Sequence, residues 1–79
     1  MLLKVKEANY VADYKIKLLF SDGVTKTVDL LNELDLPVFI PLKDLSLFKQ
    51  FVVKFNTIEW TNEVDIAPEY LYEIGHRDQ

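Results

Sequence analysis

A β-hairpin is predicted most directly by residues 14–30, YKIKLLFSDGVTKTVDL. Apolar side chains recur at every second position of the first arm, so they share one face of a strand: Tyr14, Ile16, Leu18 and Phe20. The Asp22-Gly23 pair that follows is a strong hairpin signal, because both residue types tolerate positive φ. The second arm, residues 24–30, alternates again and returns alongside the first.

Further strands are predicted on both sides of this hairpin. Residues 3–7 place Leu3, Val5 and Glu7 on one face, and residues 51–55 alternate in the same way. Residues 57–60 form the partner of residues 51–55 across a tight turn.

Short helical segments are predicted between and after these strands. Residues 30–34 follow the capping residue Asp29, and residues 44–49 make one or two helical turns, with Leu45 and Phe48 on the inner side. Residues 38–40, between two prolines, predict an extended piece. The last helix covers residues 68–74, begins at Pro68 and stops at Gly75. The pattern predicts an α+β fold, a mostly antiparallel sheet of about five strands with short helical segments packed on one side.

Length and composition indicate one small domain over residues 1–79. The chain has no Cys, which excludes a disulfide scaffold and a thiolate metal site. Its start alternates apolar and charged residues, unlike a signal peptide. The longest apolar run, residues 37–42, is far below the roughly 20 residues that span a bilayer. We therefore expect a cytoplasmic protein with no membrane partner.

The charge is unevenly distributed along the chain. The net charge is −4, and residues 57–79 alone carry six acidic residues against Arg77. This balance argues against a domain that grips nucleic acid on its own through phosphate contacts. A basic stripe would need five lysines on one sheet face, and a water-exposed surface is the commoner explanation for them. These lysines are Lys4, Lys6, Lys15, Lys17 and Lys26.

No catalytic residues are predicted. The one histidine, His76, lies three residues from the C-terminus, and neither Ser21 nor Ser46 has a neighbouring base in the sequence. A small-molecule-binding enzyme needs a pocket of about 300 Å³ or more. Because a chain of 79 residues can scarcely enclose that volume without a second subunit, this class ranks last.

A metal site and a cofactor are likewise not expected. The acidic residues of the last third do not follow the spacing of an oxygen-ligand loop, and a solvated face with an acidic helix start accounts for them. They are Glu59, Glu63, Asp65 and Glu69.

Trp60 is predicted to be buried in the core and covered by Leu71 and Ile74, which lie three residues apart on the last helix. Tyr70 and Glu73 then point outward. The predicted interaction surface is assembled around that helix from Asn62, Asp65, Pro68, Tyr70 and Glu73.

Residues 57–72, TIEWTNEVDIAPEYLY, resemble the signature of a bacterial family of small proteins, domain of unknown function number 2442. The family pattern runs threonine, aliphatic, any residue, Trp-Pro-Asn-Gly, any residue, Asp, aliphatic, Ala-Pro and then Leu-Tyr. Matches upstream lie in residues 14–20, 22–23, 28–30, 39–42, 44 and 48, so the resemblance covers nearly the whole chain. Thr61 and Glu63 depart from it, since the family usually has Pro and Gly at these positions.

The resemblance implies a compact α+β domain, found alone or joined to a helix-turn-helix segment, and often encoded beside another small protein in the manner of toxin–antitoxin pairs. It brings no catalytic residues. The leading hypothesis is therefore a non-catalytic protein-interaction module, an antitoxin-like partner of a small, basic, co-encoded protein. The alternative is a nucleic-acid-associated regulatory domain, and a homo-oligomer is left open.

Overall fold

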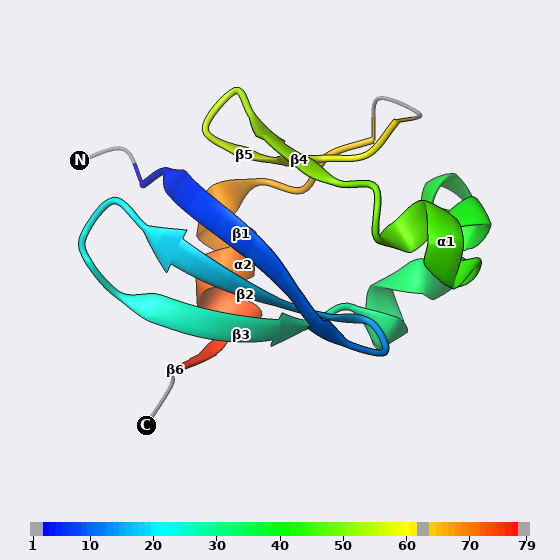
Figure 1. Cartoon of the computed structure of the whole chain (residues 1–79), viewed down its shortest axis with the longest axis horizontal. Helices are drawn as coiled ribbons and strands as arrows, with labels where there is room; N and C mark the ends of the chain where they lie inside the picture. The colour runs from blue at the N-terminus through cyan, green and yellow to red at the C-terminus, as the bar shows by residue number, and fades with distance from the viewer. Residues whose placement is uncertain (1–2, 62–63, 78–79) are drawn as a thin grey trace.

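The computed structural model describes residues 3–61 and 64–77. Its strands form two antiparallel sheets (Figure 1). The four-stranded sheet has the order β1-β2-β3-β6, with β1 at Val5–Ala12, β2 at Lys15–Phe20, β3 at Thr25–Asp29 and β6 at His76–Arg77. The two-stranded sheet pairs β4, Val52–Lys54, with β5, Thr57–Glu59. The α+β class is confirmed, but the strands are divided between two sheets instead of forming one sheet of about five.

The predicted hairpin is β2–β3, and its turn differs in detail from the prediction. The Phe20 N–H donates to the Val24 carbonyl at 2.9 Å, and the Gly23 N–H donates to the Phe20 carbonyl at 3.0 Å, which closes a three-residue loop. Of the Asp22-Gly23 pair, Gly23 takes positive φ, at 86°, and Asp22 does not. Asp22 contributes its side chain instead, which accepts a hydrogen bond from the Val24 N–H at 3.0 Å. The loop between β2 and β3 is therefore a type I turn followed by a bulge at Gly23.

Strand β1 is longer than predicted and irregular. Its pairing with β2 shifts register between Val5 and Glu7 and again between Tyr10 and Ala12. The first shift breaks the strict alternation that placed Val5 and Glu7 on one face, so Val5 is buried and Glu7 is exposed. That part of the strand prediction is wrong, because a bulge adds one residue to the strand and changes which side the next residues face.

Three short helical segments follow the hairpin: η1 at Leu31–Asp35, η2 at Pro37–Lys43 and α1 at Leu45–Phe48. The extended piece predicted for residues 38–40 is wrong, because these residues lie within the 3₁₀ helix η2. Pro37 occupies its start, where a proline is tolerated, and the Phe39 N–H donates to the Leu36 carbonyl at 2.8 Å. A period of three residues then buries Phe39 and Leu42 on the same side.

Helix α1 begins after Asp44, whose carboxylate accepts a hydrogen bond from the Ser46 N–H at 3.0 Å. The capped helical turn is confirmed. Of the expected inner pair, Phe48 is buried and Leu45 is exposed.

Trp60 is confirmed as a core residue, at 2% exposure. Its indole N–H donates to the Phe48 carbonyl at 2.8 Å, so the one polar atom of the ring is satisfied. The rings packed against it belong to Phe39, Phe48 and Phe51, with centroids 6.5, 5.8 and 6.5 Å away. Its aromatic partners thus come from η2, α1 and the approach to β4. Leu71, one of its expected covers, is fully buried, whereas Ile74 is half-buried.

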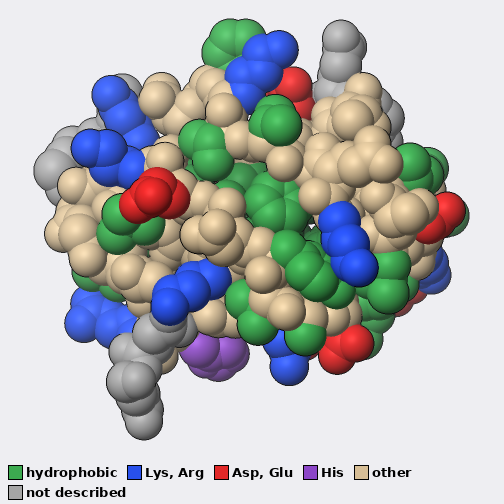
Figure 2. All heavy atoms as spheres, in the orientation of Figure 1, with side chains coloured by type: hydrophobic (Ala, Val, Ile, Leu, Met, Phe, Trp, Pro, Cys, Tyr) green, Lys and Arg blue, Asp and Glu red, His purple; other side chains and the backbone are tan. Residues whose placement is uncertain are grey.

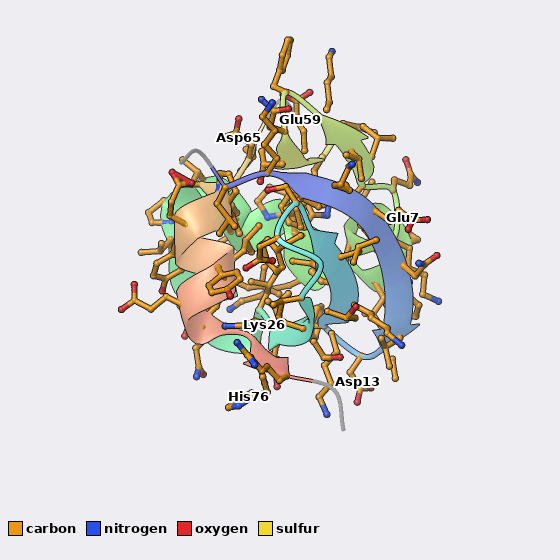
Figure 3. All side chains as sticks on the ribbon, turned by 90° about the vertical axis from the view of Figure 1, so that its left-hand side faces the viewer. Glu7, Asp13, Lys26, Glu59, Asp65 and His76 are labelled. Atoms are coloured by element: carbon orange, nitrogen blue, oxygen red, sulfur yellow. The ribbon has the colours of Figure 1, made fainter. Side chains whose placement is uncertain are left out.

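Helix α2, Pro68–Ile74, has the predicted bounds and lies behind the four-stranded sheet in Figure 1. Lys26 of β3 points toward it (Figure 3), donating from Nζ to the Tyr72 carbonyl at 2.6 Å and lying 3.7 Å from the Tyr72 ring centroid. The Tyr72 hydroxyl donates to Asp22 at 2.8 Å, and its ring meets Phe20 edge-on at 4.9 Å. These contacts hold the helix to the hairpin. None of the helices described is long and apolar enough to cross a membrane.

Candidate interaction site

A pocket of about 450 Å³ lies where η1 and η2 meet the start of α2. It is lined by Asn32, Glu33, Leu36, Phe39, Asp65, Ile66 and Tyr70. This volume does not contradict the expectation that so short a chain scarcely encloses 300 Å³ without a second subunit, because the pocket is open to solvent. The volume arises because the pocket is a surface hollow between three segments, and its rim includes the exposed side chains of Leu36 and Tyr70.

The floor of the pocket is apolar and rigidly supported. Phe39 and Ile66 are buried members of the core. Residue 66 is held by the buried Thr57 on β5, whose hydroxyl donates to the Ile66 carbonyl. Asp65 pairs with Glu59 through an isolated antiparallel bridge, and the Trp60 N–H donates to the Val64 carbonyl at 2.9 Å. Hydrogen bonds to β5 and to Trp60 therefore hold the segment that carries Asp65 and Ile66.

The rim is acidic and is joined across the pocket by one hydrogen bond. The Tyr70 hydroxyl on α2 donates to the Glu33 carboxylate on η1. This hydrogen bond raises the pKa of the Tyr70 phenol above its ordinary value, and the charge of Glu33, partial desolvation and the charge of Glu73 add to the shift. Ion pairs in the described part of the chain join Lys43 to Asp35 and Lys54 to Glu59. Within residues 3–61 and 64–77, neither Glu33 nor Asp65 has a cationic partner.

Exposed aliphatic residues occur along η1, η2 and the residue between them, and we call them the apolar strip: Leu31, Leu36, Val38 and Ile40, of which Leu36 also lines the pocket. Each is between 50% and 59% exposed. Single exposed apolar residues need no explanation, but four within ten residues and beside a pocket are typical of an interaction surface.

The structure brings together two of the five residues predicted for an interaction surface. Asp65 and Tyr70 line the pocket, and Tyr70 is 41% exposed. Pro68 is half-buried at the start of α2, and Glu73 is exposed one turn beyond Tyr70. Asn62 lies outside the described residues.

Sequence reasoning missed the half of the pocket that η1 and η2 supply, namely Asn32, Glu33, Leu36 and Phe39. Their proximity to α2 is a long-range contact that no local pattern encodes. One signal in the sequence was Leu36, an apolar residue directly before Pro37. No core position was predicted for Leu36, and such a residue is a candidate for an exposed surface.

The residues considered for catalysis are distant from this pocket or engaged locally. His76 lies at the end of the molecule opposite Glu59 and Asp65 (Figure 3). Ser21 accepts a hydrogen bond from the Lys4 N–H at 3.0 Å, and Ser46 donates to Asp44 at 2.7 Å.

The acidic residues considered for a metal site are spread over several elements. Glu59 and Asp65 face one another across the bridge, Glu69 is in the first turn of α2, and Glu63 is outside the described residues. In the described part of the chain, His, Asp and Glu side chains form no group of three or more suited to a metal ion.

The five lysines considered as a stripe do not share one surface. Lys17 lies opposite Asn9 and Thr27 in the sheet, whereas Lys26 lies opposite Leu18 and turns to the side of α2. On the face away from α2, Figure 2 shows hydrophobic side chains in the middle, with more Lys and Arg than Asp and Glu around them.

The segment that carried the family resemblance has mainly structural roles. The Thr57 hydroxyl donates to the Ile66 carbonyl, and Trp60 is buried in the core. Pro68 is the first residue of α2, and Leu71 is the buried residue of that helix. Asp65 and Tyr70 differ from these residues, since both are exposed at the pocket rim.

Comparison with known families matches residues 5–77 to the family described as Protein of unknown function (DUF2442). No curated protein and no solved structure matches the chain. Because the family match covers nearly its whole length, the chain belongs to the DUF2442 family.

Proposed function

We propose that this protein is a non-catalytic interaction module that binds a small basic protein, encoded beside it, through the pocket and the apolar strip. The observation that carries the proposal is the adjacency of exposed aliphatic residues on η1 and η2 to a pocket with two carboxylates on its rim. Protein interfaces commonly combine an apolar centre with a polar rim.

The charge distribution supports a basic partner. Residues 57–79, which supply one side of the pocket, carry six acidic residues against Arg77, a net charge of −5, whereas the rest of the chain has a net charge of +1. Complementary charge accelerates encounter and disfavours acidic competitors, while the aliphatic and aromatic contacts supply affinity. An antitoxin-like module would work in this way, by covering a basic functional surface of its partner in the cytoplasm.

Co-expression with the small protein encoded next to this gene tests the proposal. The untagged protein should co-purify with its tagged neighbour. Ile40→Asp on the apolar strip should abolish co-purification, because it places a charge within the apolar part of the proposed interface. Val11→Asp is the matched control, since Val11 on β1 has the same 50% exposure as Ile40 but lies outside the strip.

Both variants should keep the circular dichroism spectrum and melting transition of the parent protein. Failure of the parent protein to co-purify under mild lysis would contradict the proposal, as would equal loss of binding by the two variants.

A regulatory nucleic-acid-associated domain is the second candidate. Its support is the surplus of Lys and Arg side chains on the sheet face in Figure 2. Filter binding of double- and single-stranded DNA at low salt tests it, because binding through phosphates weakens steeply as salt rises. Absence of retention at the lowest salt would reject this candidate.

A further inference from the structure

We propose that the pocket between η1 and α2 binds one arginine side chain of the protein partner. This proposal rests on the proposed function and names the chemistry of its central contact. The pocket offers a long apolar wall and charged acceptors, two features that an arginine side chain requires together.

The apolar part of the pocket fits the aliphatic stem of such a side chain. Leu36, Phe39 and Ile66 supply hydrocarbon surface, and the last two are fixed in the core. A volume of about 450 Å³ is in the range of small-molecule sites and admits a long side chain with its neighbouring backbone.

The polar part of the pocket fits a guanidinium group. Glu33 and Asp65 come from opposite sides of the pocket, on η1 and on the segment after β5. Neither carboxylate is neutralised by a cation of the described chain. Guanidinium presents several donors in one plane and binds carboxylates in a bidentate manner, which a lysine ammonium cannot do.

Tyr70 makes the pocket selective for a planar cation. Its hydroxyl donates to Glu33, so the ring is held beside the carboxylate at the pocket wall, where the residue is 41% exposed. Arginine stacks on aromatic faces while its edge donates to carboxylates. One side chain can therefore use the ring, the carboxylates and the apolar wall together.

The experiment uses single amino-acid probes and the ¹⁵N-labelled protein, so it requires no protein partner. N-acetyl-arginine amide is titrated while amide chemical shifts are recorded, with N-acetyl-lysine amide and N-acetyl-norleucine amide as comparisons. A ligand of this size should bind with a dissociation constant on the order of 1 mM. The largest shifts should fall at Glu33, Asp65, Ile66 and Tyr70, and the lysine and norleucine probes should bind about tenfold more weakly.

Two isosteric variants remove the charges of the pocket. Glu33→Gln and Asp65→Asn should each weaken arginine binding about three- to tenfold, and both variants should remain folded with a cooperative melting transition. Glu7→Gln is the control, because Glu7 is an exposed carboxylate on β1, away from Asp65 in Figure 3.

Three results would overturn the arginine receptor: equal binding of all three probes, shifts spread over surface carboxylates outside the pocket, or arginine binding unaffected by both pocket variants. If the co-encoded protein still co-purifies under those circumstances, the proposed function stands without this contact. If arginine binds in the pocket but no protein partner co-purifies, the pocket assignment stands and the proposed function fails.

Discussion

At the scale of single residues, the hydrogen bond between Tyr70 and Glu33 links α2 to η1 and changes how the phenol titrates. The bond to Glu33 is the first cause of the raised pKa of Tyr70. A raised pKa means that folding favours the protonated phenol. The corresponding stability is complete below the unfolded pKa, near 10, and is lost as the pH rises through the higher folded value.

We expect Glu33→Gln to lower the pKa of Tyr70 toward 10, because the acceptor remains but its negative charge is removed. The measurement is a titration of tyrosine ring carbons by NMR, with Tyr70→Phe identifying the signal. The control variant Glu7→Gln should leave the pKa of Tyr70 unchanged. An unchanged Tyr70 titration in Glu33→Gln would show that Glu33 is not the cause.

Thr57 is a second residue whose side chain positions the pocket. It is buried, and its hydroxyl is bonded to the Ile66 carbonyl. Thr57→Val keeps the shape but leaves that carbonyl without its donor, so we expect a loss of about 1–3 kcal/mol in the free energy of unfolding.

Thr57→Ser keeps the hydroxyl and should cost less, about 1 kcal/mol for the lost methyl group. Urea unfolding of both variants gives the comparison. A larger loss for Thr57→Ser than for Thr57→Val would show that the methyl group, and not the hydrogen bond, matters at this position.

At the scale of elements, the end of α2 depends on a close approach to β3. Helix α2 stops at Gly75 as predicted, but Gly75 has φ −72° and does not use the left-handed region that favours glycine. A Cβ at this position would lie 2.9 Å from Lys26 Cβ and 3.1 Å from the Leu71 carbonyl oxygen. The residue must be glycine because helix and strand meet here without room for a side chain.

We therefore expect Gly75→Ala to destabilise the protein by about 1–3 kcal/mol, the usual cost of overpacking. Chemical unfolding measures the loss, and NMR shifts should appear at Lys26 and Tyr72, where α2 rests on β3. Gly23→Ala is the comparison, because Gly23 has open space around it but a φ of 86°, so its cost is local to the turn. Unaltered stability of Gly75→Ala would contradict the close-packing explanation.

At the scale of the whole molecule, Trp60 joins the two sheets and the helical segments into one core. Its ring packs among Phe39, Phe48 and Phe51, and its N–H is bonded to the Phe48 carbonyl. Truncating a buried Trp costs about 3–5 kcal/mol, which is comparable to the entire stability of so small a domain.

Trp60→Ala should therefore be unfolded at 25 °C by circular dichroism. Trp60→Phe should remain folded with a lower melting temperature, since it keeps an aromatic ring but leaves the Phe48 carbonyl unpaired. A Trp60→Ala protein with the parent melting behaviour would show that this ring is not essential to the core.

Local patterns were sufficient wherever one segment carries its own signal. Alternation in residues 14–30, the Asp44 cap and the Pro68 start each specify an element through neighbouring residues, and the corresponding β2–β3 hairpin, α1 and α2 are confirmed. The burial of Trp60 also followed from its type and phase on a strand. Asp65 and Tyr70, predicted as polar and aromatic residues that the core does not need, both line the pocket, and their part in an interaction stays a prediction.

The remaining features depend on contacts between distant segments. Residues 37–43 form a 3₁₀ helix, which buries Phe39 and Leu42 in a core that the local sequence does not contain. The bulge in β1 is set by its pairing with β2, and Gly75 is required by its distance from Lys26. The pocket itself exists because η1 and α2 converge, bringing Glu33 to Tyr70 across 37 positions of the chain. Such approaches arise from the packing of whole elements, and the free energy of that packing is shared among residues far apart in the chain.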